Sequence, residues 1–128
     1  MDKGLGLRWI KMAAIYLVVG VGLGIHMGKS HDFVLAPVHA HINLLGWATM
    51  ALMGVLHHLF AAQLVNKLAQ VQFWLHQVAT PIMLIALAAL LSGNAAVEPV
   101  VGIASIVVGV SVLLFLVNVL RNLRAAST

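Results

Sequence analysis

Four long apolar segments, separated by short polar ones, dominate the chain. They cover residues 9–27, 35–62, 71–91 and 97–120. A helix of about 20 apolar residues crosses the hydrocarbon core of a bilayer, so each segment predicts one transmembrane helix. The connections are only a few residues long, which favours antiparallel neighbours. The pattern predicts an all-α, integral membrane four-helix bundle of up-down-up-down order, with residues 1–128 in a single domain.

The composition points in the same direction. Hydrophobic residues make up 62% of the chain and charged residues 8%, whereas a soluble domain has about 45–50% apolar and 25% charged residues. Three further apolar segments follow the first, so we expect the first to remain as a helix and not to be removed as a signal peptide. The chain has no cysteine, which excludes disulfides, thiolate-bound metals and haem attached through cysteine.

The seven basic residues lie at the ends of the apolar segments. One of them, Lys29, lies in the first connection, and the other six flank the termini and the second connection: Lys3, Arg8, Lys11, Lys67, Arg121 and Arg124. Because basic residues accumulate on the cytoplasmic side, we expect both termini to be cytoplasmic, in a bacterial-type inner membrane. Trp9 and Trp74 are then expected in an interfacial aromatic belt. Clustering at helix ends, without a basic stripe, argues against a nucleic acid partner.

Small residues recur at spacings of three or four residues in two segments. Gly20, Gly24 and Gly28 share one face of the first segment, which permits close helix packing, or alternatively makes room for a flat cofactor. The last segment carries a similar face, made by Gly102, Ser105 and Gly109. Since four helices are few to enclose a macrocycle, we expect a homo-oligomer whose interface uses these faces.

Histidines are the most unusual feature of the chain, which has seven of them and only three acidic residues. Ionisable groups inside a membrane span are costly and mark candidate functional sites. Imidazole is also a good ligand for iron, copper and zinc. By depth the histidines form an outer group and an inner group. The outer group is His26, His31, His39 and His41, and the inner group is His57, His58 and His76.

The second segment carries a polar stripe. His39 and His57 are eighteen residues apart, which is five turns of an α-helix, so both lie on one face. Asn43, Gly46, Met50 and Met53 lie on the same stripe. We expect this stripe to face the interior of the bundle. His41 lies about 200° from His39, so both cannot face one centre unless the helix is distorted or has neighbours on two sides.

The stretch HAHINLLGW from His39 to Trp47, followed by Met53 and Gly54, resembles the second transmembrane helix of the catalytic subunit of the haem-copper oxidases, most of all the nitric oxide reductases. In that family a histidine, with an asparagine two residues later, supplies an axial ligand to the low-spin haem b. The resemblance implies that His41, followed by Asn43, is such a ligand. It covers about twenty residues, and the late helices that carry the family's other ligands have no counterpart here. The resemblance therefore implies a stand-alone short relative, not a complete oxidase or reductase.

The predicted cofactor is haem b, with copper or zinc as the alternative. We expect His26 to be the partner of His41, because the two lie at similar depth on adjacent helices. A second haem or metal is predicted between His76 and either His57 or His58. The full set of predicted cofactor-binding residues is His41, His26, His39, His76, His57 and Asn43, of which His41, His26 and His76 are predicted to bind the metal.

Several functions follow from these ligands. Two axial histidines would favour electron transfer, with quinol or a respiratory-chain protein as partner, whereas one histidine would leave a position open for nitric oxide or oxygen. Any enzyme would be an oxidoreductase. The alternatives are a copper or zinc protein and a cofactor-free assembly subunit of a respiratory complex. The metal alternative would use His26, Met27, His31 and Asp32 at the outer mouth, with Met50 and Met53 deeper. Hydrolytic catalysis and nucleotide binding have no supporting motif.

Overall fold

The fold is all-α, and the computed structural model describes residues 4–125. It contains four helical stretches long and apolar enough to cross a membrane: Leu5–Ser30, Ala36–Leu59, Lys67–Leu91 and Ala95–Asn122. The predicted four-helix architecture is confirmed. The four apolar stretches indicate a multi-pass protein in contact with a lipid bilayer.

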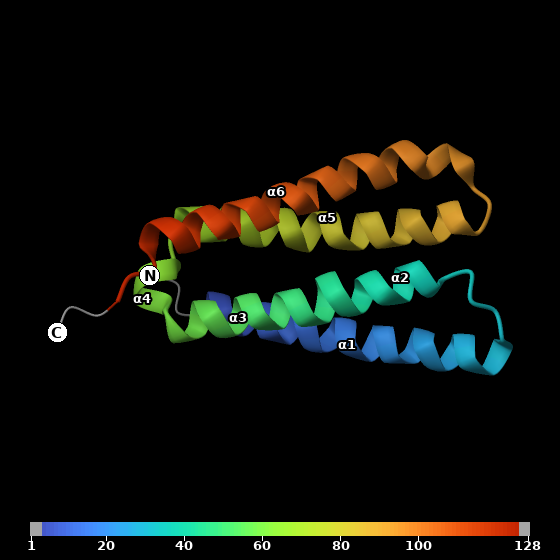
Figure 1. Cartoon of the computed structure of the whole chain (residues 1–128), viewed down its shortest axis with the longest axis horizontal. Helices are drawn as coiled ribbons and strands as arrows, with labels where there is room; N and C mark the ends of the chain where they lie inside the picture. The colour runs from blue at the N-terminus through green and yellow to red at the C-terminus, as the bar shows by residue number, and fades with distance from the viewer. Residues whose placement is uncertain (1–3, 126–128) are drawn as a thin grey trace.

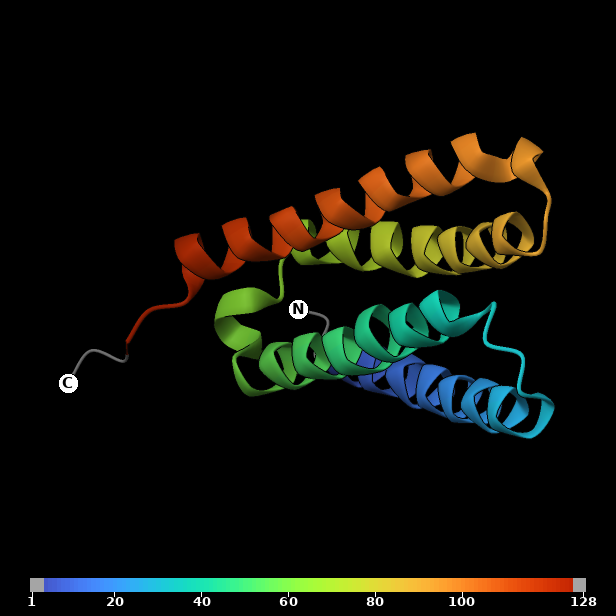
Figure 2. The same ribbon diagram turned by 45° about the vertical axis from the view of Figure 1, so that its right-hand side comes forward.

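The helices form two hairpins that lie side by side (Figures 1 and 2). In chain order the elements are α1 (Leu5–Ser30), α2 (Ala36–His41), the π-helix η1 (Ile42–Ala48), α3 (Thr49–Leu59), α4 (Ala61–Leu64), α5 (Lys67–Leu91), the 3₁₀ turn η2 (Ala95–Val97) and α6 (Glu98–Asn122). The first hairpin pairs α1 with α2, η1 and α3, and the second pairs α5 with α6. We call the end that carries α4 and both described chain ends the terminal end, and the opposite end, with the connections 31–35 and 92–94, the far end (Figure 1).

Helix α1 and helix α5 are both longer than the apolar pattern predicts. The pattern records only the part that matches the hydrocarbon core, whereas the helices continue into charged sequence at the terminal end. The side chain of Asn66 caps α5 by accepting a hydrogen bond of 3.0 Å from the amide of Ala69. At the far end α1 stops at His31, whose left-handed φ of 54° is incompatible with a further helical turn.

The second span is not the single helix predicted for residues 35–62. Its middle, η1, is a π-helix, in which amides bond five residues back: the amide of Thr49 donates to the carbonyl of Leu44. The span then ends at Phe60, whose φ of −112° and ψ of 35° separate α3 from α4. Apolar periodicity cannot reveal a π-turn, because the residues within it are as apolar as those of an ordinary helix. Such turns are rare and frequently lie at functional sites.

Two glycines allow α1 and α3 to cross closely near the terminal end. A Cβ atom at Gly6 would lie 2.7 Å from the carbonyl oxygen of Gly54, and one at Gly54 would lie 2.9 Å from that of Gly6. Beside this crossing Trp9 is fully buried and packs with Met50, Met53 and the other side chains of the core. The expectation that Trp9 belongs to an interfacial belt is wrong, because the close crossing places its indole between the hairpins. Trp74, by contrast, is 58% exposed.

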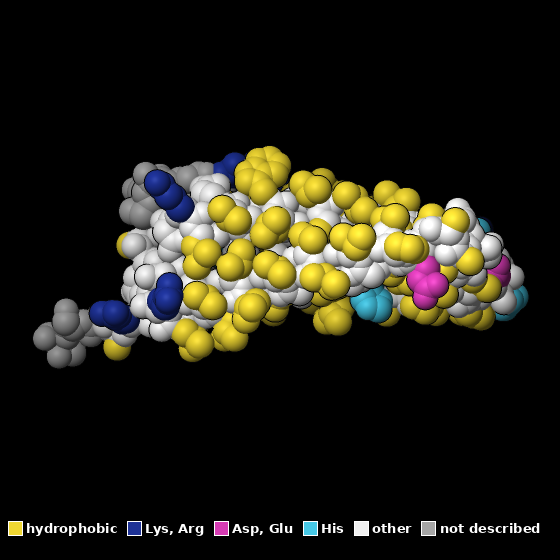
Figure 3. Space-filling view, turned by 90° about the horizontal axis from the view of Figure 1, so that it is seen from above, with side chains coloured by type: hydrophobic (Ala, Val, Ile, Leu, Met, Phe, Trp, Pro, Cys, Tyr) yellow, Lys and Arg dark blue, Asp and Glu magenta, His cyan; other side chains and the backbone are white. Residues whose placement is uncertain are grey.

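The surface separates into an apolar middle and two polar ends. Figure 3 shows Lys and Arg at the terminal end, and Asp, Glu and His toward the far end. The described basic residues of the terminal end are Arg8, Lys11, Lys67, Arg121 and Arg124, while Lys29 ends α1 at the far end. Lys3 lies outside the described residues. Between the ends, large apolar side chains are exposed on all four spans, as lipid contact requires.

Candidate functional site

The glycine face of α1 is filled by polar side chains of the second span. A Cβ atom at Gly20 would lie 2.5 Å from Oδ1 of Asn43, and one at Gly24 would lie 2.9 Å from Cε1 of His39. His39 donates from Nδ1 to the carbonyl of Gly20 at 2.8 Å, and Asn43 donates from Nδ2 to the carbonyl of His39 at 2.9 Å. Of the two predicted uses of this face, the structure shows close packing. Gly28 takes no part in it, because no atom lies within 4 Å of the position that a Cβ atom would occupy there.

The predicted polar stripe of the second span does face the interior. Gly46, Met50, Met53 and His57 are buried, and His39 and Asn43 are half-buried against α1. The two methionine sulfurs each accept a hydrogen bond from an amide of α5. Gln72 donates to Sδ of Met53 at 3.1 Å, and Gln77 donates to Sδ of Met50 at 3.5 Å. The stripe therefore joins the two hairpins.

His41 and His57 make the same local hydrogen bond. Each donates from Nδ1 to the carbonyl four residues earlier, His41 to Pro37 and His57 to Met53, both at 2.7 Å. Since a carbonyl only accepts, the proton lies on Nδ1, and in the neutral ring Nε2 carries a free lone pair. This is the arrangement of a histidine that binds metal through Nε2. The two rings differ in their surroundings, because His41 is partly exposed and His57 is fully buried.

The buried His57 lies between aromatic side chains of two other helices. Its ring centroid is 6.4 Å from that of Trp9 and 5.9 Å from that of Phe115. Its Nε2 and the indole nitrogen of Trp9 are both buried without a hydrogen-bond partner. A side chain packed in this way leaves no room for a macrocycle beside it.

His76 uses both of its ring nitrogens to hold helices together. Nε2 donates to the carbonyl of Leu45, in the π-helix, at 3.1 Å, and Nδ1 lies 2.9 Å from the hydroxyl of Ser111 on α6. The ring is fully buried and 5.3 Å from that of Trp9. The structure thus brings His57 and His76 to the same indole but leaves His76 without a free lone pair. These two residues do not fit a bis-histidine haem site.

The predicted pairing of His26 with His41 is not assembled within one chain. Gly24 faces His39, and His26, two residues further along α1, lies about 200° away on the exposed face. His41 is likewise about 200° from His39 and so turns away from α1. Similar depth, on which the pairing was predicted, does not specify the direction in which a side chain points.

The remaining candidates are exposed. His31 lies at the end of α1, and His58 lies on α3 with its side chain outside the bundle. Among residues 4–125 no three His, Cys, Asp or Glu side chains come close enough to share one metal ion.

Sequence reasoning missed the polar residues of α5 and α6 that complete the interior. Gln72, Ser111 and Asn118 are buried. Gln72 and His76 are four residues apart in an otherwise apolar span, and this spacing was a signal that one polar face of α5 points inward. No comparable signal marks Ser111 or Asn118.

The chain matches no family model, no curated protein and no solved structure. The likeness to the haem-copper oxidases therefore depends on the stretch from His39 to Gly54 alone. Of the two histidines in that stretch, His39 has its Nε2 3.5 Å from Nδ2 of Asn43, whereas Nε2 of His41 is free. Among the described residues nothing bonds to that atom.

Proposed function

We propose that this chain is a b-type haem protein of a bacterial inner membrane and that His41 is an axial ligand through Nε2. The observation that carries the proposal is the hydrogen bond of 2.7 Å from Nδ1 of His41 to Pro37, which fixes the ring and leaves Nε2 free on a partly exposed face. A flat macrocycle could reach His41 from outside the bundle. Haem iron would supply one-electron chemistry or a binding position for a diatomic gas.

A second axial ligand would come from another copy of the chain. His26 lies on the exposed face of α1, Nδ1 of His39 donates to the carbonyl of Gly20 on α1, and both ring nitrogens of His76 are hydrogen-bonded to other helices. A homo-oligomer with two ligands would favour electron transfer, for example from quinol. A single ligand would favour binding of nitric oxide or oxygen.

The proposed orientation places the terminal end in the cytoplasm. Five of the described basic residues lie at that end and one, Lys29, at the far end. This asymmetry is the one that sets the orientation of bacterial inner-membrane proteins. His41 then lies in the outer half of the membrane.

Optical spectra of the detergent-purified protein, oxidised and then reduced with dithionite, test the proposal. We expect a sharp b-type spectrum on reduction in the unaltered chain, and its loss in His41→Ala. His58→Ala is the matched control, since this exposed histidine lies at the other end of the same span. Size-exclusion profiles verify that each variant is folded, and a colourless protein from haem-replete cells would overturn the proposal.

A cofactor-free assembly subunit is the second candidate, and one observation favours it. His39 and His76 form hydrogen bonds between helices, and His57 is packed between aromatic rings. Three of the seven histidines therefore make contacts that stabilise the packing of the helices. A colourless protein that binds neither copper nor zinc in metal analysis would support this candidate. Copper or zinc found in the colourless protein would instead support the metal alternative.

A further inference from the structure

A pocket in the membrane-spanning part of the molecule lies between the two hairpins. Its volume is ≈ 380 Å³, and sites for small molecules have volumes of about 300–1,000 Å³. Ile15 of α1 and Ile85 of α5 line the pocket and are exposed, so it opens toward the lipid. The rest of the lining comes from the same two helices and from Val38 and Ile42 of the second span.

Tyr16, the only tyrosine of the chain, lines this pocket from α1. It lies near the middle of its helix, whereas tyrosines of membrane proteins are enriched at the interfaces. Gly46 lets the ring pack against η1, since a Cβ atom at Gly46 would lie 2.5 Å from Cγ of Tyr16. The hydroxyl makes no hydrogen bond with any described residue. An unpartnered hydroxyl in hydrocarbon is costly, so its position favours a ligand with a polar group in the middle of the membrane.

Gln77 lines the same pocket from the middle of α5. Its Nε2 donates to Sδ of Met50, while its Oε1 has no hydrogen-bond partner among the described residues. Pro81 follows one turn later and has no amide hydrogen, so the backbone carbonyl of Gln77 lacks the hydrogen bond that residue 81 of a regular helix would supply. Position 77 therefore carries two acceptors without their ordinary partners, and both match a hydroxyl donor.

Depth and charge restrict what the pocket can hold. No charged side chain lines it, and a charged group is costly at the centre of a bilayer, so the headgroup of a phospholipid does not suit it. An acyl chain, or an apolar helix of a second copy, would leave the hydroxyl of Tyr16 without a partner. The ligand that matches is neutral and soluble in lipid, and it carries hydroxyl groups on a compact ring.

We propose that this pocket binds an isoprenoid hydroquinone. One hydroxyl of the ring donates to an acceptor of Gln77, the other forms a hydrogen bond with the hydroxyl of Tyr16, and the tail passes between Ile15 and Ile85 into the lipid. Because the acceptors of Gln77 need a donor, the reduced form binds more tightly than the quinone.

The pocket borders the helical segment that carries the proposed haem ligand. Val38 and Ile42 line it, and His41 lies between them in the sequence, one turn after Val38. Binding of the hydroquinone does not depend on haem. Only its use as an electron donor to haem rests on the proposed function.

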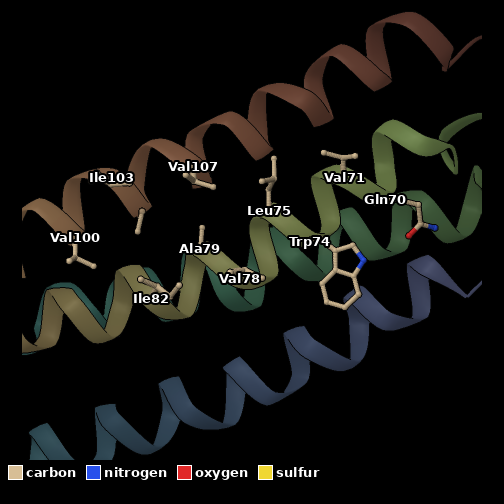
Figure 4. A pocket seen from close by; sticks show the side chains of 11 residues that line it. Gln70, Val71, Trp74, Leu75, Val78, Ala79, Ile82, Val100, Ile103 and Val107 are labelled. Carbon is tan, nitrogen blue, oxygen red and sulfur yellow. The ribbon is translucent and has the colours of Figure 1, made fainter.

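A larger groove between α5 and α6 provides a comparison (Figure 4). Its volume is ≈ 700 Å³, and apart from Gln70 at one end its lining is apolar, including Ile103 of α6. No tyrosine lines this groove, so it does not match a hydroquinone in the way that the pocket between the hairpins does.

Equilibrium binding of decylubiquinol, a hydroquinone with a short saturated tail, tests the site on the full-length chain in detergent under anaerobic conditions. We expect saturable binding of one molecule per chain, and weaker binding of the oxidised quinone. The dimethyl ether of the same hydroquinone has no hydroxyl group to donate and should bind about tenfold more weakly.

Tyr16→Phe removes only the hydroxyl and should weaken the binding of decylubiquinol about tenfold. Ser105→Ala is the matched control, because it removes an exposed hydroxyl from another span, outside the pocket. Its affinity for decylubiquinol should equal that of the unaltered chain.

A pair of tryptophan variants tests the space. Ile85 and Ile103 are both exposed, but Ile85 lines the pocket between the hairpins and Ile103 lines the α5–α6 groove. We expect Ile85→Trp to lose the binding of decylubiquinol and Ile103→Trp to keep it. Neither substitution disturbs the core, and size-exclusion profiles verify that both variants fold.

Four outcomes would overturn the proposal: no saturable binding, equal affinity for the dimethyl ether, an equal loss of binding in the two tryptophan variants, and displacement of decylubiquinol by phosphatidylglycerol. The test also separates this site from haem. A colourless protein that binds decylubiquinol would support the site and count only against haem. A haem protein without saturable binding would overturn the site and leave the haem proposal intact.

Discussion

At the scale of single residues, surroundings decide what a histidine does. His41 and His57 make the same hydrogen bond to their own helix, but His57 is buried beside Trp9 whereas His41 is partly exposed. His76 is as deeply buried as His57, yet both of its nitrogens are bonded. The sequence could identify all three as unusual. It could not separate a free lone pair from an engaged one, because that depends on carbonyls and hydroxyls of other helices.

Ser111→Ala tests the link that His76 makes to α6. The substitution removes the hydroxyl 2.9 Å from Nδ1 and leaves a buried ring nitrogen without a partner, so we expect a loss of about 1–2 kcal/mol in the free energy of unfolding. Ser105→Ala is the matched control. Ser105 lies on the same helix, but it is exposed and its hydroxyl donates to the carbonyl of Val101 within α6, so its removal should have little effect on the free energy of unfolding. Equal losses in detergent unfolding would show that the link to His76 contributes nothing.

At the scale of elements, the four spans were predictable but the form of the second was not. Hydrophobicity over about 20 residues reports the thickness of the bilayer, and it located every span. The π-helix η1 has no such signature. Within it, the carbonyl of Leu45 accepts the hydrogen bond of His76 from α5, a contact between distant parts of the chain that apolar periodicity does not record. Close approach was likewise predicted at Gly20 and Gly24, but the contact between Gly6 and Gly54 was missed because neither has another glycine four residues away.

Gly6→Ala tests the crossing of α1 and α3. A methyl group at this position would lie 2.7 Å from the backbone of α3, which cannot yield as a flexible side chain can, so we expect a loss of about 1–3 kcal/mol in stability. Gly109→Ala on α6 is the control, because nothing lies within 4 Å of its added methyl group. An alanine in a helix is favoured over glycine by up to about 1 kcal/mol, so the control should be neutral or stabilising. Unfolding of both variants in the same detergent gives the comparison, and equal stability of the two would refute the tight crossing.

At the scale of the whole molecule, polar contacts join the hairpins at the terminal end. Asn118 of α6 donates to the carbonyl of Leu64 at 2.9 Å, and its Oδ1 accepts from Asn66 at 2.8 Å and from Asn122 at 2.7 Å. These bonds tie the turn after α4 to the end of α6, while the histidine, glutamine and methionine contacts join the hairpins further along. The basic residues lie on the same end as this network. The terminal end of the molecule therefore carries both this asparagine network and most of the basic residues.

The orientation of the molecule can be measured directly because the chain has no cysteine, so a single introduced thiol has no background. Ser92 is exposed in the connection at the far end, and Ala62 is exposed on α4 at the terminal end. If the terminal end is cytoplasmic, a membrane-impermeant maleimide added to intact bacterial cells should label Ser92→Cys but not Ala62→Cys, provided the outer membrane admits the reagent. Permeabilising the inner membrane should make Ala62→Cys reactive, and both variants should react in detergent, which verifies that each thiol is accessible. Labelling of Ala62→Cys alone in intact cells would place the terminal end outside. His41 would then lie in the inner half of the membrane, and haem bound there would exchange electrons with cytoplasmic partners.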